Sequence, residues 1–312
     1  MDAILAGARV ALQCSRPTFQ RKVWPMSVAI ERRGFSLPLG VGPEAEIFVV
    51  GDIHGRSDLL GALIDEAARE PKLRDERAIV FLGDLIDRGP DSLGAIDLAM
   101  GAKARVGADQ AVALMGNHEA MMRLALDSET PWRDAIDAFE TWMANGGDRT
   151  VAEFLKTGRQ SEDLGGRLTE ARTSLPSRVQ AWLASLRTSW RSGKVLFVHA
   201  GVNPQVELEA FLAAPWNTPL AELDEDRHWA WVRWPFLEHC PGADGFSGFF
   251  VVHGHTPNDA TRNPSHANQI NGFRLNLDAG SAMTGVAKMA ILRDKQAEVV
   301  SARGSDGWRS KR

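Results

Sequence analysis

The residues of this chain that could perform chemistry stand in three short motifs, each directly after an apolar run. The motifs read Gly-Asp-Ile-His-Gly at residues 51–55, Gly-Asp-Leu-Ile-Asp-Arg-Gly at 83–89 and Gly-Asn-His-Glu at 116–119. They offer carboxylate, imidazole and amide ligands without a cysteine, a mixture that selects borderline to hard divalent ions such as Mn, Fe or Zn over Cu(I) or an iron–sulfur cluster. The motifs therefore predict a metal site.

Two later motifs repeat the pattern of an apolar run followed by histidine. Residues 195–198 precede His199, and residues 249–252 precede a His-Gly-His-Thr-Pro stretch that holds His253 and His255. Each motif alone could be a turn with a capping Asp, the start of a helix capped by Asn, or a histidine satisfied at a strand end. Five such features in order favour a dinuclear metal site.

The apolar runs indicate the elements that would position these ligands. The runs at 47–50, 78–82 and 111–115 are short and continuous, as in strands that are covered on both faces. Helical spacing follows the first two, beginning near Ser57 or Asp58 and near 90–92. The interval of about thirty residues between motifs is the size of one βαβ unit. The motifs should therefore lie at the carboxyl ends of neighbouring parallel strands, where open α/β sheets place ligands.

With these motifs the chain resembles the calcineurin-like metallophosphoesterases, and within them the phosphoprotein phosphatase branch, especially bacterial and phage members like the lambda phosphatase. The resemblance covers about residues 46–292. It implies an α/β fold, a four-layer α/β/β/α sandwich of two mixed sheets with a helical insertion. It also implies two divalent metal ions, Mn first with Fe or Zn as alternatives. The implied ligands are Asp52 and His54 for the first ion, Asp84 between the two ions, and Asn117, His199 and His255 for the second.

The same resemblance implies that His118 is the general acid with Asp87 as its partner, and that Arg88 and Arg233 bind phosphate oxygens. The leaving alkoxide of a phosphomonoester needs a proton, and a general acid contributes typically ~10² to 10⁴ in rate. Arginine's planar fork matches two phosphate oxygens at once. Arg233 could equally make a structural cation–π contact in its Trp-Val-Arg-Trp context. His253 is expected to support a ligand or to have no role, and Asn-Gly-Gly at 145–147 resembles a motif of this branch or is simply a turn.

The function implied is hydrolysis of phosphomonoesters by in-line attack of a hydroxide that bridges the two ions, in a serine/threonine-type protein phosphatase. The partners would be phosphorylated proteins or small phosphoesters. An alternative is a dinucleoside polyphosphate hydrolase of the Ap4A type, although His54 stands where its symmetrical version usually has glutamine. A third is a non-catalytic module that binds phosphoproteins, which would need no general acid.

Composition excludes several classes. The chain has 312 residues, 44% of them apolar, enough for a large core, and its net charge of −4 gives no basic footprint for nucleic acid. Two cysteines are too few for a disulfide framework and favour a reducing cytoplasm. No run approaches the length of a membrane span.

The chain divides into a catalytic domain at 45–303 and two tails. Residues 1–44 show no strand or ligand pattern and are expected to be a poorly structured tail, within which Met26 could be the true start. Residues 304–312 form the second tail. Residues 120–190 predict a helical cap whose tryptophans pack in its core, and residues 203–246 predict loops over the metal site that select the substrate.

Overall fold

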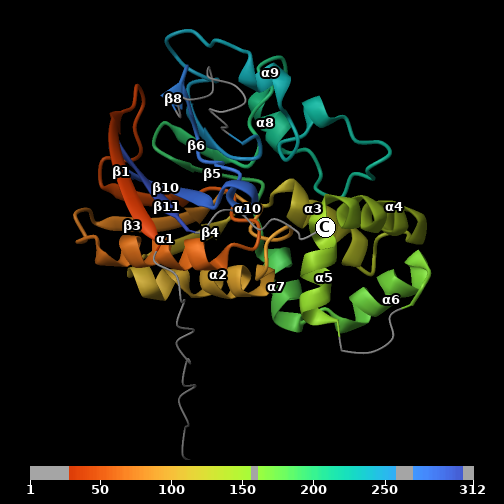
Figure 1. Cartoon of the computed structure of the whole chain (residues 1–312). Helices are drawn as coiled ribbons and strands as arrows, with labels where there is room; N and C mark the ends of the chain where they lie inside the picture. Colours follow the sequence, from red (N-terminus) through yellow and green to blue (C-terminus); the bar gives the residue numbers. More distant parts are fainter. Residues whose placement is uncertain (1–27, 156–160, 258–269, 305–312) are drawn as a thin grey trace, which may run out of the picture.

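Two β-sheets lie face to face in the computed structural model of the chain, which describes residues 28–155, 161–257 and 270–304 (Figure 1). The first sheet has the order β1-β11-β10-β2-β3-β4, with β1 (Ala29–Ser36), β2 (Ala45–Val50), β3 (Glu76–Phe81), β4 (Gln110–Ala113), β10 (Val286–Arg293) and β11 (Gln296–Arg303). The second has the order β5-β6-β7-β9-β8, with β5 (Ser189–Ser192), β6 (Val195–Val198), β7 (Phe250–His253), β8 (Ile270–Asn271) and β9 (Arg274–Asn276). Both sheets are mixed, because β2, β3 and β4 run parallel, as do β6, β7 and β9, while their outer neighbours are antiparallel.

The crossovers between the parallel strands of the first sheet are α1 (Ser57–Arg69) and α2 (Ser92–Val106), which lie together on its outer face (Figure 1). Asp91 caps α2 by accepting the backbone N–H of Gly94. In contrast, α1 has Arg56 at its N-cap position, and no side chain caps it. Both helices were predicted from the sequence, and α1 begins at Ser57, one of the two starts that the spacing indicated.

Alternation along the strands produces the four layers. Ile47 and Val49 of β2 belong to the apolar cluster between the two sheets, whereas Phe48 and Val50 point to the helical layer. Leu196 on β6 likewise faces outward, toward α8 (Leu208–Leu212) and α9 (Trp234–Leu237), which lie over the second sheet (Figure 1). The predicted α/β/β/α sandwich is therefore confirmed.

The segment that connects β4 to β5 along the chain is helical, and it lies to one side of the two sheets (Figure 1). It contains α3 (Asn117–Leu126), α4 (Trp132–Trp142), a kinked turn η1 (Met143–Gly147), α5 (Asp148–Phe154), α6 (Leu164–Ser174) and α7 (Ser177–Ser185). Of its tryptophans, Trp142 and Trp182 are buried as expected, but the side chain of Trp132 is 52% exposed. The stretch at 203–246 has only α8, α9 and a single 3₁₀ turn at Glu225–Arg227 as helical elements. The short α10 (Ser281–Thr284) follows β9, and no helix in the described part of the chain could cross a membrane.

The predicted N-terminal tail, residues 1–44, includes a strand that belongs to the domain. Strand β1 pairs with β11 along its whole length, so the domain includes at least residues 29–36. This strand is hard to predict because it lies at the edge of the sheet with no buried residue, so the alternation that marks a half-buried strand is missing. Residues 1–27, with Met26, and residues 305–312 lie outside the described residues.

Candidate metal centre

The loops that follow β2, β3, β4, β6 and β7 meet at one edge of the two sheets. Each carries predicted ligands, and all of them are buried: Asp52, His54, Asp84, Asn117, His199 and His255. His54, Asp84 and His255 have positive φ angles of 46°, 51° and 68°, a conformation that side chains with a Cβ rarely adopt. Such strain persists where the surrounding structure imposes it, often at functional sites.

Two groups of potential ligand atoms share the carboxylate of Asp84. One group contains His54, Asp84 and His118, and the other contains Asp84, His199 and His255. Asp84 Oδ2 lies 3.6 Å from His54 Nε2, while Asp84 Oδ1 lies 3.5 Å from His199 Nε2. The two oxygens of one carboxylate therefore face two different groups.

Asn117 belongs to the second of these regions through its side-chain oxygen. Asn117 Oδ1 lies 2.9 Å from His255 Nδ1 and 3.2 Å from His199 Nε2. An amide oxygen between two imidazole nitrogens and a carboxylate makes a mixed N/O donor set, which suits Mn, Fe or Zn.

The histidines are held in the form that binds metal. The Nδ1–H groups of His54 and His199 donate to the backbone carbonyls of Ile86 (3.0 Å) and Leu82 (2.9 Å), so each Nε2 presents a lone pair toward Asp84. In His255 the roles are reversed, because Nε2 donates to the backbone carbonyl of Trp231 at 3.2 Å and Nδ1 faces the side-chain oxygen of Asn117. Burial lowers the pKa of all three rings. They remain neutral over a wide pH range as a result.

Asp52 lies beside these groups rather than within them. Its Oδ2 accepts the backbone N–H of His255 at 3.0 Å, but its buried Oδ1 has no hydrogen-bond partner in the described part of the chain. A side chain at Gly254 would reach within 1.9 Å of that oxygen. Burial, and then the charges of Asp278 and Asp84, raise the pKa of Asp52. A buried carboxylate oxygen without a partner is what a bound cation would satisfy, so the residues present fit divalent metal ions.

His118 is paired with Asp87 at the edge of the first group. His118 Nδ1 and Asp87 Oδ2 are 2.6 Å apart, and the carboxylate of Asp87 also accepts from Trp142 Nε1 at 2.8 Å and from the hydroxyl of Thr150 at 2.5 Å. Burial works against the charged ring, but the charges of Asp84 and Asp87 outweigh it and raise the pKa of His118. His118 therefore binds a proton more readily than the other site histidines.

The two arginines differ in how they reach the site. Arg88 Nη1 lies 2.9 Å from His54 Nε2, and its Nη2 lies 2.8 Å from His118 Nε2. The guanidinium thus lies across the first group. Arg233 forms an ion pair with Glu225 at 3.6 Å, and its charge contributes to the lowered pKa values of His199 and His255. Arg233 is therefore on the side of the second group.

Two buried carboxylates beside the predicted ligands were missed from the sequence. Glu119 is fully buried and accepts backbone N–H groups of Asp84 (2.8 Å), Leu85 (2.8 Å) and Gly116 (2.9 Å). The sequence did contain a signal for Glu119, because this residue is the last of the Gly-Asn-His-Glu motif. Asp278 is also buried, two residues after the end of β9, and burial raises its pKa to about 6.

His253 is buried between the metal region and the loops above the second sheet. Its Nδ1 lies 3.1 Å from the Gly254 carbonyl oxygen, its ring meets that of Phe236 edge-on at 4.9 Å, and burial lowers its pKa to about 3. It belongs to neither group of ligand atoms.

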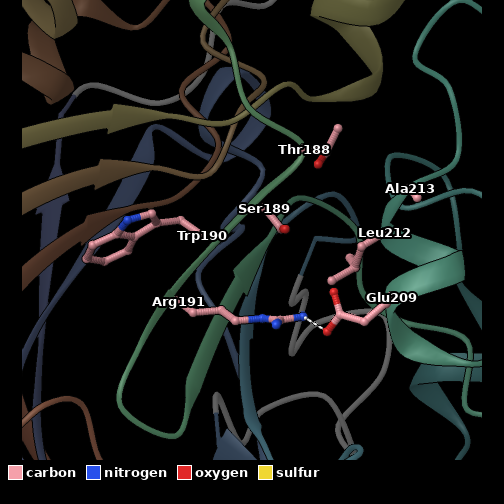
Figure 2. A pocket seen from close by; sticks show the side chains of 7 residues that line it. All are labelled: Thr188, Ser189, Trp190, Arg191, Glu209, Leu212 and Ala213. Atoms are coloured by element: carbon pink, nitrogen blue, oxygen red, sulfur yellow. Dashed lines mark hydrogen bonds and ion pairs between the residues drawn. The ribbon is translucent and has the colours of Figure 1, made fainter.

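A separate pocket of about 420 Å³ lies between β5 and α8, and Figure 2 shows the residues that line it. An ion pair of 2.6 Å between Arg191 and Glu209 crosses it. None of the predicted site residues lines this pocket, so its contents would not meet the metal groups.

With this geometry established, comparison with known proteins identifies the family. The family model described as "Calcineurin-like phosphoesterase" matches residues 45–300. The chain belongs to this family. The resemblance predicted from the motifs is therefore confirmed.

Named relatives are similar over shorter or weaker matches. The chain is 37% identical over 118 residues to "Serine/threonine-protein phosphatase 1" of Salmonella typhimurium, which covers 38% of this chain and 46% of that protein. It is 36% identical over 107 residues to "Serine/threonine-protein phosphatase 2" of Escherichia coli, covering 33% and 38%. It is 25% identical over 263 residues to an asymmetrical bis(5'-nucleosyl)-tetraphosphatase of Anoxybacillus flavithermus, covering 81% and 92%. The matched part thus spans less than half the length of the two phosphatases.

Proposed function

We propose that this chain is a dinuclear-metal phosphomonoester hydrolase, most simply a serine/threonine-type protein phosphatase. The observation that carries the proposal is the convergence of three functions at one point: the shared carboxylate of Asp84, the His118–Asp87 pair and the guanidinium of Arg88. A module that only binds phosphoproteins would need no buried acid–carboxylate pair.

The metal ligands would be Asp52, His54, Asp84, Asn117, His199 and His255, with Mn as the first choice and Fe or Zn as alternatives. When bound, such a pair of ions supplies an activated water and neutralises charge on the phosphoryl group. The chain's own part is to hold neutral imidazoles and a shared carboxylate in place, which the carbonyl contacts of His54 and His199 do.

His118 would deliver the proton that the leaving alkoxide needs. Asp87 orients the ring through Nδ1, so Nε2 is the atom that faces the leaving group. Without substrate, Arg88 donates one hydrogen bond to His118 Nε2 and another to His54 Nε2. A phosphoryl group offers anionic oxygens, which are better acceptors for a guanidinium than imidazole nitrogens. Substrate binding would therefore draw Arg88 away from His118 and free its Nε2 to carry a proton. Arg233 would bind phosphate from the side of His199 and His255.

A second candidate is hydrolysis of dinucleoside polyphosphates. The match to the tetraphosphatase supports it, because it extends over 92% of that protein, whereas the matches to the protein phosphatases are local. The same metal groups and arginines would serve both reactions, so the choice depends on the loops over the site. The two cysteines of the sequence support a place in a reducing cytoplasm for either enzyme.

One assay tests both the chemistry and the choice of substrate. Phosphoserine and phosphothreonine peptides are compared with diadenosine tetraphosphate in the presence of added Mn²⁺, by kcat/KM. We expect the peptides to be preferred, and a preference for the dinucleotide would replace the first candidate by the second.

The Asp84→Asn variant tests the metal dependence. Because it removes a charge shared by both groups, metal content should fall together with kcat/KM, by at least about 100-fold. Asp97→Asn, at an exposed ion pair on α2, is the matched control and should change neither. An Asp84 variant that keeps two ions and a near-normal rate would overturn the assignment.

A further inference from the structure

The Asn-Gly-Gly stretch at 145–147 lies in an unusual helical turn that borders the site. Helix α4 ends at Trp142, and the chain passes through a kinked turn at Met143–Gly147 into α5. Within it Gly146 has φ 102° and ψ 11°, outside the helical region. Glycine adopts a positive φ of this kind without the steric cost that other residues meet.

This turn directs two backbone carbonyls at Arg88. The carbonyl oxygen of Gly146 accepts the backbone N–H of Arg88 at 3.2 Å, and that of Asn145 accepts its Nε–H at 3.3 Å. Arg88 has a positive φ of 65°, a conformation that needs support from its surroundings. The other guanidinium nitrogens point to His54 and His118. The turn therefore holds both ends of the side chain that crosses the first group.

The close approach explains the glycines. A Cβ at Gly146 would lie 2.8 Å from Arg88 Cγ and 3.1 Å from its backbone N, in addition to the strain of its φ. A Cβ at Gly147 would lie 2.6 Å from the ring of Trp142, whose Nε1 donates to Asp87. One glycine thus lets the turn reach Arg88, and the other leaves room for the side chain that holds the partner of His118.

We propose that Gly146 is a positioning residue: the kinked turn at Met143–Gly147 in the insertion sets the place of the Arg88 guanidinium, and the insertion is part of the phosphoryl site. This inference rests on the proposed function, because hydrolysis is one of its readouts. It goes beyond the metal site, since Gly146 touches no ligand and acts only through Arg88.

A double-mutant cycle tests whether Gly146 acts through Arg88. Displacement of a binding group by about 1 Å can cost ~100-fold, so we expect a loss approaching that size in kcat/KM for Gly146→Ala. In an Arg88→Ala background the same Gly146→Ala substitution should cost roughly nothing, because there is no guanidinium left to misplace. Equal losses in both backgrounds would show a general structural effect and overturn the proposal.

A control variant separates the effect of backbone strain at a glycine from the effect of a misplaced Arg88 side chain. Gly107 also has a positive φ, 65°, at the end of α2, but an added Cβ would meet nothing within 4 Å. Gly107→Ala should lower the thermal midpoint without a fall in kcat/KM. If Gly146→Ala does not fold, Asn145→Ala replaces it in the cycle. The exposed side chain of Asn145 donates to the Thr141 carbonyl at 2.8 Å. Its loss should lower kcat/KM by a smaller factor, roughly tenfold, and this loss should also disappear in the Arg88→Ala background.

Binding of inorganic phosphate to the Mn²⁺-loaded protein, measured by calorimetry, separates the two proposals. Gly146→Ala should weaken phosphate binding as Arg88→Ala does, whether or not any phosphoester is hydrolysed. A wild-type protein that binds phosphate but hydrolyses nothing would sink the proposed function alone. Unchanged phosphate binding in Gly146→Ala, with weakened binding in Arg88→Ala, would sink the positioning role alone.

Discussion

At the scale of single residues, the site uses one side-chain type in two ways. His54 and His199 are buried against backbone carbonyls, and burial lowers the pKa of each ring. His118 is equally buried, but its partner is the carboxylate of Asp87, and its pKa is raised. Environment thus divides the rings into two that stay neutral and one that holds a proton more readily, which is what the proposed ligand and proton-donor roles require.

The His118→Asn variant tests the proton-carrying role, because a general acid matters in proportion to how badly the leaving group needs its proton. With phosphoserine peptides the loss in kcat/KM should approach the upper part of ~10² to 10⁴, and with p-nitrophenyl phosphate it should be much smaller. Arg88→Ala should lower kcat/KM for both substrates by comparable factors, because the proposed contact of Arg88 is to the transferred phosphoryl group. Equal losses for the His118 variant on both substrates would mean that it donates no proton.

A second residue-scale prediction concerns pH and His228. This buried ring lies between Trp229 and Trp231, accepts the N–H of Ala230 at 3.2 Å, and has a pKa that burial lowers to about 4. The unfolded chain, with a pKa near 6.5, binds the proton first. Stability is therefore complete above about pH 6.5 and falls as the pH drops toward 4, by on the order of 3 kcal/mol for this group. Urea unfolding of the metal-free protein should show a flatter pH dependence for His228→Gln than for wild type, and identical slopes would contradict it.

At the scale of elements, the strand ends were the most predictable part of the site. Continuous apolar runs before each motif predict buried parallel strands, and the ends of such strands must meet. The strands β2, β3, β4, β6 and β7, and the meeting of the predicted ligands at their ends, therefore followed from the sequence. The partners of Asp87 did not. Trp142 and Thr150 come from the insertion, 55 and 63 residues further along the chain, and no local pattern predicts a contact of that length.

Glu119 shows how one helix fixes two strand ends. Its carboxylate joins the start of α3 to the backbone N–H groups of Asp84 and Leu85 after β3. Glu119→Gln keeps one acceptor oxygen but turns an NH₂ group toward buried N–H donors, which should cost about 1–3 kcal/mol of unfolding free energy. Mn²⁺ affinity should fall as well, because Asp84 moves. Thermal unfolding and calorimetry measure the two effects, and the exposed Glu129→Gln on the same segment should show neither. An unchanged Mn²⁺ affinity would mean that Asp84 does not depend on this contact.

At the scale of the whole molecule, the site belongs to neither sheet alone. The first sheet and its loops supply Asp84 and Asn117, the second supplies His199 and His255, and the Leu114–Arg187 bridge joins the two edges. Metal ions that bind only this assembled state would stabilise it by mass action. The far edge of the first sheet could not be predicted from the sequence, because an exposed edge strand lacks the alternation of buried and exposed residues that marks a strand.

That edge yields the last prediction. Strand β1 covers β11 along eight residues, and Arg32 at its centre pairs with Glu66, Glu70 and Glu298, so it joins the edge to α1. A chain that begins at Leu37 leaves β11 as an open edge and should unfold roughly 5–10 °C below a chain that begins at Val28. It should also self-associate, because an open edge offers unpaired backbone groups. Since β1 lies at the opposite end of the sheet from β3 and β4, metal content below the unfolding temperature should not change. Calorimetry, light scattering and metal analysis on both chains test this prediction. Equal thermal midpoints would show that β1 adds no stability. Loss of metal in the folded shorter chain would show that the edge strand supports the site.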